Sequence, residues 1–247
     1  MRPDRENPYS ATIHIAIILA LALFFWSAAP AAAQTTAGTV SSVSGQVQIQ
    51  HNGATAAATV GATVSQSDRI ITGADGHVVI ILSDQSKLEL GGSTSISLDQ
   101  YTSGGATPTR VSLFSGVMRS LVNATGGPAN YQVHTPNAIA AVRGTKFDVG
   151  YSEGSVRPGY DGCDRYTDTA VLEGTVNLTN AANPDSGSDI QAGYEATVPC
   201  GQSVSAAGPL AMTGAFSSGG GSNGFTGPPP SSGGAPPPAC PVCAGNM

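Results

Sequence analysis

The side chains in this chain that are most suited to redox chemistry belong to four cysteines, Cys163, Cys200, Cys240 and Cys243. Cys240 and Cys243 are two residues apart, which is the spacing of a redox dithiol. A redox thiolate, however, is stabilised by a helix N-terminus and a surrounding fold, whereas this pair lies among prolines and glycines. A small disulfide loop, or cross-linking between copies of the chain, explains the pair better than oxidoreductase activity.

Other catalytic and metal-binding patterns are weak. His51, His77 and His134 lie on separate segments without the paired spacing of zinc ligands. The carboxylates between residues 152 and 168 lack the alternating oxygen ligands of a calcium loop. No serine elbow, carboxylate dyad or Cys-His arrangement stands out, although folding can bring distant residues together. We therefore predict no metal, no cofactor and no enzymatic activity.

Residues 152–168 form the strongest candidate for a binding site. Polar and aromatic residues in a loop on a rigid scaffold are typical of binding sites. A surface loop stapled by a disulfide is the favoured interpretation of this segment, and recognition of a partner is the functional one. The candidate binding residues are Tyr160, Asp161, Asp164, Arg165, Tyr166 and Asp168.

The N-terminus has the pattern of an export signal. Arg2 and Arg5 precede an apolar stretch over residues 13–26, and three alanines at 31–33 supply a cleavage pattern of small residues. We expect a signal helix over residues 1–33, cleaved after Ala33, and a periplasmic or secreted mature chain with no stable membrane insertion. An uncleaved anchor is the alternative, because the apolar stretch approaches the ~20 residues that cross a bilayer.

Export places all four cysteines in a compartment where disulfides persist. Four cysteines allow three pairings, and sequence alone does not choose among them. The arrangement we favour joins Cys163 to Cys200 and leaves Cys240 with Cys243.

Composition favours an all-β chain with no nucleic-acid partner. Charged residues make up 11% of the chain and the net charge is −6, so no basic surface is available to neutralise phosphates. Abundant turn formers, including 32 glycines, and 6% aromatics suit short strands better than helices.

From about residue 38 to residue 198, short alternating apolar runs are separated by turn signals. Leu88, Leu90, Ile96 and Leu98 are predicted to be buried, and the unbroken apolar run 77–82 predicts a strand covered on both faces. Asn52 and Gly53 predict a tight hairpin. We predict one all-β domain over residues 34–207, a sandwich or a short β-roll, with its last strand beginning at residues 193–196.

The segment after the predicted domain has little to bury. Residues 208–247 are mainly Gly, Ser, Ala and Pro, and they end in the two closely spaced cysteines. Such a segment does not offset its ordering entropy by burial, so we predict a disordered tail.

Several blocks of the chain, in order, resemble the FecR-domain family. The most specific block joins two apolar stretches through the corner Arg143, Gly144 and Thr145. Within the strand–turn–strand block 82–90, Gln85 stands where the family usually has glycine. The blocks are residues 61–64, 68–73, 82–90, 135–136, 141–149 and 171–176.

The resemblance implies an all-β envelope domain and a role in binding or signalling. Well-known members of the family are inner-membrane regulators with a cytoplasmic segment that binds a sigma factor. Only about a dozen residues precede the apolar stretch here, so the chain resembles the periplasmic domain on its own.

The signature corner is interpreted as structural. Gly144 is expected to adopt a conformation closed to other residues, and Arg143 is expected to pair internally with Asp148 or Glu173, since half-buried arginines are usually paired. A ligand contact by Arg143 is the alternative. The residues of this corner are Arg143, Gly144, Thr145, Phe147, Asp148, Glu173 and Gly174.

The function that follows is that of an exported, non-catalytic, FecR-like module. It would recognise an envelope protein or surface ligand through exposed sheet edges and the 152–168 loop. Two alternatives remain. One is a structural surface protein that self-associates through its tail cysteines, and the other is an enzyme of unrecognised type acting on wall polymers.

Overall fold

The computed structural model describes residues 35–102, 107–123 and 131–210 of the chain. All regular structure in these residues is β-strand, which confirms the all-β prediction. The expected signal helix, most of the expected tail, Cys240 and Cys243 lie outside the described residues. Within these three ranges, no helix is long and apolar enough to cross a bilayer.

The strands are numbered in chain order. They are β1 (Thr36–Ser44), β2 (Val47–His51), β3 (Ala54–Ala57), β4 (Thr63–Ser65), β5 (Arg69–Thr72), β6 (His77–Leu82), β7 (Lys87–Leu90), β8 (Ser95–Gln100), β9 (Thr109–Leu121), β10 (Tyr131–His134), β11 (Ala138–Val142), β12 (Lys146–Glu153), β13 (Arg165–Glu173), β14 (Thr175–Asn180), β15 (Asn183–Gln191), β16 (Tyr194–Pro199) and β17 (Gly208–Pro209).

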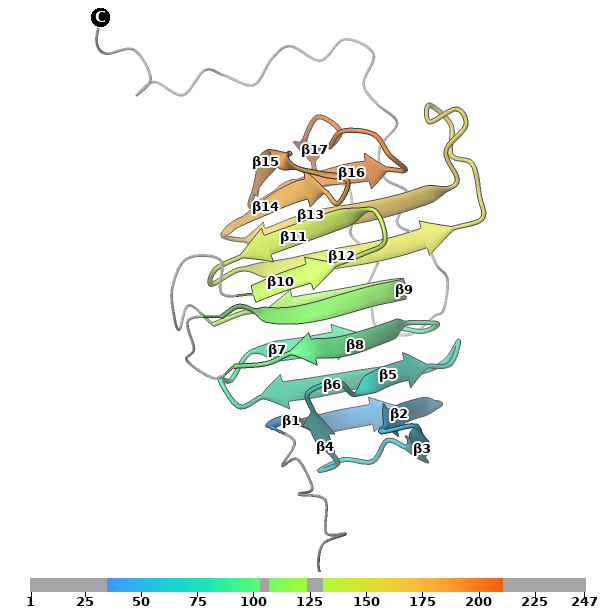
Figure 1. Ribbon diagram of the computed structural model, residues 1–247, viewed down its shortest axis with the longest axis vertical. Helices are drawn as coiled ribbons and strands as arrows, with labels where there is room; N and C mark the ends of the chain where they lie inside the picture. Colours follow the sequence, from blue (N-terminus) through green and yellow to red (C-terminus); the bar gives the residue numbers. More distant parts are fainter. Residues whose placement is uncertain (1–34, 103–106, 124–130, 211–247) are drawn as a thin grey trace, which may run out of the picture. The chain divides into compact units, whose positions relative to one another are not determined.

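The strands pair into two ladders, and in both ladders the strands follow one another along the long axis of the view in Figure 1. Ladder A runs β4, β1, β6, β7, β9, β12, β13, β16, β17. Ladder B runs β3, β2, β5, β8, β9, β10, β11, β14, β15. The pairing is antiparallel except between β9 and β10. Side chains between the ladders form one core, as in a sandwich.

The chain crosses repeatedly from one ladder to the other, as in a roll. Strand β9 makes the crossing without a break, because Thr109–Ser115 pairs in ladder B and Gly116–Leu121 pairs in ladder A. Gly116, at the change, has a φ of 85°. A Cβ there would lie 2.3 Å from the Thr94 hydroxyl oxygen. Only glycine fits this crossing without strain.

The core follows the alternation that the sequence predicts. Leu88, Leu90, Ile96 and Leu98 are all at most 1% exposed. Strand β6 is buried at Val78, Val79, Ile80 and Leu82, as expected for a strand covered on both faces. These apolar side chains hold the two ladders together, because each removes apolar area from water.

Two of the turns with left-handed residues bear on the sequence predictions. Asn52 and Gly53 have φ values of 49° and 81° and connect β2 to β3, which confirms the predicted hairpin. Gln85 has a φ of 67° in the turn between β6 and β7. The turn therefore forms without the usual glycine, and Gln85 adopts the left-handed conformation itself.

One more strand follows the strand that we predicted to be the last. The strand expected at residues 193–196 is β16, but the short β17 follows it and pairs with Tyr194 and Glu195. The sequence also did not predict β15, in which only Ile190 is buried. Polar edge strands of this kind lack the apolar alternation by which strands are predicted.

Replacing Gly116 with alanine is expected to destabilise the domain by ~2 kcal/mol or more, because a positive φ and a steric clash coincide. Gly61→Ala is the matched control, since Gly61 has the same φ of 85° but a Cβ added there would meet no atom within 4 Å beyond its chain neighbours. Urea unfolding of both variants measures the difference. Equal losses of unfolding free energy in the two variants would show that a Cβ at position 116 causes no steric clash.

Candidate functional site

The signature corner lies where the chain passes from ladder B to ladder A, between β11 and β12. It packs against the turn by which the chain returns to ladder B, between β13 and β14. Gly144 has a φ of 61°, as expected, and Gly174 has a φ of 84°. Thr145 is buried, and its hydroxyl lies 3.1 Å from the carbonyl oxygen of Thr175, to which it can donate. A Cβ on Gly174 would lie 2.9 Å from that hydroxyl. Thr145 and the two glycines therefore hold the corner between β11 and β12 against the turn between β13 and β14.

The expected partner of Arg143 is wrong. Arg143 is exposed, and the described residues contain no ion pair with it. Asp148 is instead bound by Arg119, whose Nε and Nη2 donate to the two carboxylate oxygens at 2.7 and 2.8 Å. Glu173 lies 3.9 Å from the Lys146 ammonium group.

The pair between Arg119 and Asp148 joins β9 to β12 in ladder A, where the two residues are register partners. Asp148 is 3% exposed. Burial raises the pKa of the Asp148 carboxyl, and the hydrogen bonds from Arg119 oppose that rise. The same hydrogen bonds raise the pKa of Arg119. The carboxylate is tolerated in this buried place because two nitrogens of the guanidinium, Nε and Nη2, donate to it.

The 152–168 segment contains a second buried carboxylate, Asp168 on β13. Arg157 donates to its two oxygens at 2.9 and 2.8 Å and to the Ser152 hydroxyl at 2.8 Å. The Thr197 hydroxyl donates to the same carboxylate at 2.7 Å. The guanidinium of Arg157 also lies 4.2 Å from the centre of the Tyr166 ring. The loop between β12 and β13 is therefore clamped onto the outer face of ladder A.

A disulfide between Cys163 and Cys200 closes the other side of the loop, which confirms the pairing we favoured. The two cysteines form a small core with Tyr160 and Tyr166, separate from the main one. The tyrosine rings meet edge to face with centroids 5.5 Å apart. The backbone amide of Arg157 donates to the Tyr166 hydroxyl at 3.0 Å, and that hydroxyl donates to the carbonyl of Cys163.

The candidate binding residues therefore fall into two groups. Tyr160, Tyr166 and Asp168 are buried and shape the loop, so they do not offer a contact surface, contrary to the expectation. The latter two lie on β13 instead of in a loop. The exposed group consists of Asp161, Asp164 and Arg165, to which the structure adds Val156, 64% exposed.

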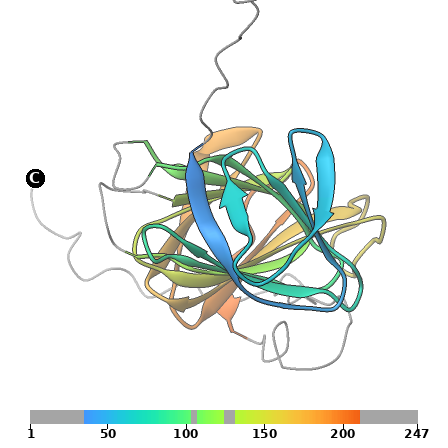
Figure 2. The same cartoon turned by 90° about the horizontal axis from the view of Figure 1, so that it is seen from below.

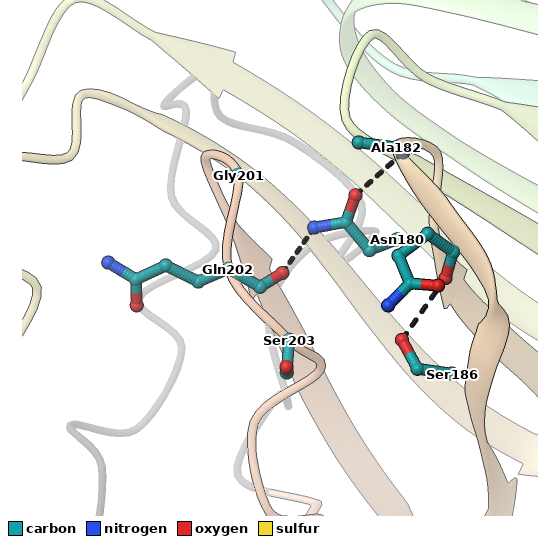
Figure 3. A pocket seen from close by; sticks show the side chains of 7 residues that line it. Asn180, Ala182, Ser186, Gly201, Gln202 and Ser203 are labelled. Atoms are coloured by element: carbon teal, nitrogen blue, oxygen red, sulfur yellow. Dashed lines mark hydrogen bonds between the residues drawn. The ribbon is translucent and has the colours of Figure 1, made fainter.

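A shallow polar hollow lies elsewhere, where the β14–β15 turn meets the segment after Cys200 (Figure 3). The Asn180 side chain closes it by donating to the carbonyl of Gln202 and accepting from the amide of Ala182 at 2.8 Å. Ser186 donates to the carbonyl of Asn183 at 3.1 Å. These polar groups satisfy each other, so the hollow is a turn contact and presents no catalytic group.

Residues 68–177 match the model of a protein family described as FecR protein. The chain therefore contains a FecR domain, as its sequence blocks predicted. The matched residues run from the start of β5 into β14. They include the signature corner and the loop at residues 154–164, which we call the stapled loop.

The similarity to solved structures is weaker. Two crystal structures of a candidate anti-sigma factor from Parabacteroides distasonis are 19% identical to this chain, with TM-scores of 0.43, over 57% of this chain and 59% of theirs. The chain thus spans less than two thirds of those proteins. A cell surface anchoring domain is 24% identical, with a TM-score of 0.24, over 25% of this chain and 82% of its own. No curated protein matches the sequence.

Sequence reasoning missed the two arginines that hold the buried carboxylates. Arg119 lies 29 residues before Asp148, and its partner follows only from knowing that β9 and β12 are neighbours. Arg157 had a local signal, because it lies 11 residues before Asp168 in the same polar segment.

Arg119→Met is expected to destabilise the domain by about 3–5 kcal/mol at neutral pH, because a buried carboxylate loses its partner. Without the arginine, the pKa of Asp148 rises further above its unfolded value. The folded state then takes up a proton as the pH falls through that raised pKa, so the loss relative to the parent shrinks in acid. Chemical unfolding across pH 4 to 8 measures this.

The double variant Arg119→Met, Asp148→Leu is the control for charge. It is expected to recover most of the lost stability and to lose the pH dependence of the single variant. A single variant that is equally unstable at all pH values would contradict a role based on charge.

Replacing both Cys163 and Cys200 with serine is expected to destabilise the domain by about 3–4 kcal/mol, the chain-entropy value for a 37-residue separation. The loop at residues 154–164 should become the first site of limited proteolysis. Replacing Cys240 and Cys243 with serine is the control and should change neither. Unaltered proteolysis of the loop without its disulfide would show that the Arg157 clamp suffices.

Proposed function

We propose that this chain is a non-catalytic binding module of the bacterial cell envelope, which recognises a protein through the stapled loop at residues 154–164. The observation that carries the proposal is the number of interactions that fix this one loop. A bidentate ion pair, a guanidinium–ring contact and a disulfide all act on it. Loops fixed on a scaffold in this way are typical of recognition.

Fixing the loop supports binding because a preorganised surface loses little conformational freedom when a partner docks. The exposed residues of the loop suit a protein surface. Val156 offers an apolar contact, and Asp161 and Asp164 offer negative charge. Arg165, the first residue of β13, offers positive charge beside the loop. A partner with an apolar residue and charges of both signs would complement them.

A non-catalytic role is supported by the state of two buried carboxylates in and beside the loop. Asp148 and Asp168 each face a guanidinium that donates two hydrogen bonds. A general acid or base needs a proton that it can exchange with a substrate. These two carboxylates act within the scaffold instead, as partners of arginines.

The cellular place that we infer is the periplasm or the cell exterior. The match to the FecR family, the export-signal pattern of residues 1–33 and the disulfide between Cys163 and Cys200 support it together. The ligand is then an envelope protein, and a signalling role follows if that protein is a receptor or transporter.

A structural surface protein is the second candidate. One observation favours it: Cys163 and Cys200 bond to each other, which leaves Cys240 and Cys243 for cross-links between chains. On that account, covalent multimers would appear on non-reducing gels and disappear with reductant.

The test places a photo-crosslinking amino acid at Val156 in intact cells, with a second version at Val60 as the control. Both positions are highly exposed, at 64% and 65%. We expect one envelope protein to be captured from position 156 only, and the charge reversals Asp164→Lys with Arg165→Glu to abolish that capture without changing the melting temperature. Capture of the same protein from both positions, or none from position 156, would contradict the proposal.

A further inference from the structure

The N-terminal end of the two ladders is formed by the uncharged residues 52–67. Ladder B ends there in β3 and ladder A ends in β4. Figure 2 views the ladders from this end. All four residues of β3 are exposed, and Val60 between the two strands is 65% exposed. Residues 52–67 contain no charged side chain.

The free edge of β3 offers backbone hydrogen-bonding groups. Strand β3 pairs only with β2 among the described residues, through the register Gln48 to Ala57 and His51 to Ala54. Its other edge therefore presents donors and acceptors, and an edge strand of this kind accepts a further strand unless charges or prolines block it. Nothing of that sort protects β3, whose side chains are three alanines and a threonine.

The opposite end of the ladders is protected. Strand β15 at the end of ladder B contains Pro184, Asp185 and Asp189. Strand β17 at the end of ladder A has two residues, of which one is Pro209. Proline removes a donor, and aspartates repel a second acidic edge. Of the two ends, only the N-terminal one is built to accept a strand.

We propose that this N-terminal end binds a second copy of the chain, head to head across a two-fold axis. A two-fold axis perpendicular to the ladders keeps each ladder in its own layer and reverses the direction of its strands. Strand β3 then lies antiparallel to β3 of the second copy, and ladder B continues from one protomer into the other. Strand β4 does not take part in this pairing, because the amide and carbonyl of Ser65 already bond to Asp68.

Charge and shape favour a second copy as the occupant. A two-fold interface brings the same patch of both chains together, so any charge in it would meet its like. The absence of charge over residues 52–67 removes that penalty, although each whole chain carries a net charge of −6. The small side chains of β3 let two backbones approach, and Val60 gains apolar contact.

The contact is small. Four residues of β3 form each edge, so the dimer is expected to be weak and reversible, with a Kd in the micromolar range or above. The stapled loop connects β12 to β13, away from β1 to β4 (Figure 1). The dimer would therefore present two such loops to a partner.

Sedimentation equilibrium of the chain from Gln34 onward tests the proposal, with Cys240 and Cys243 replaced by serine to remove tail cross-links. The parent is expected to show a reversible monomer–dimer equilibrium. Thr55→Lys brings one lysine from each copy into the contact between the two β3 strands and should raise the dimer Kd at least ~10-fold. Thermal melting confirms that this variant folds.

Ser188→Lys on β15 is the matched control and should leave the equilibrium unchanged. A parent that stays monomeric at the highest concentrations would overturn the proposal, as would a dimer indifferent to Thr55→Lys. Higher oligomers that grow with concentration would indicate head-to-tail association and would also overturn it.

Discussion

The crossing of β9 between the two ladders is the constraint on which the rest of the fold depends. One continuous strand pairs with β8 and β10 in ladder B and with β7 and β12 in ladder A. The strands before and after it are therefore parts of one sheet, joined at a glycine that tolerates no side chain. Any shift in this strand would move the register of both ladders at once.

Two buried carboxylates on the outer face of ladder A are held in the same way. Asp148 and Asp168 lie on the neighbouring strands β12 and β13, and each is held by two hydrogen bonds from an arginine on a different segment. Arg119 comes from β9 and so joins two strands, whereas Arg157 comes from the loop and fixes it to the sheet. The same chemistry thus serves the scaffold in one place and the candidate binding site in the other.

The strand pattern, the FecR signature and the disulfide were predictable because each leaves a local trace. Alternating leucines mark β7 and β8, the Asn52 and Gly53 pair marks a hairpin, and the cysteines have few pairings. The partner of Arg143 was not predictable, because the choice among arginines depends on which strands are neighbours. Strand β15 was missed for a different reason, since its side chains are almost all polar and exposed.

The loop illustrates the same limit. Its composition predicted a binding segment, but Tyr160, Tyr166 and Asp168 turned inward to build it. Only three-dimensional packing separates residues that shape a loop from those that it presents. The exposed set is smaller than the sequence indicated, and it includes Val156, which no polar or aromatic pattern marks.

The central claim is that the loop is rigid before any partner binds. Hydrogen exchange of the oxidised chain tests it most directly, at the amides of Gly154, Tyr160 and Cys163, which donate to loop carbonyls. The account predicts protection of these amides comparable to that of β12 and β13 on either side of the loop. Exchange at the rate of an unstructured peptide would contradict it.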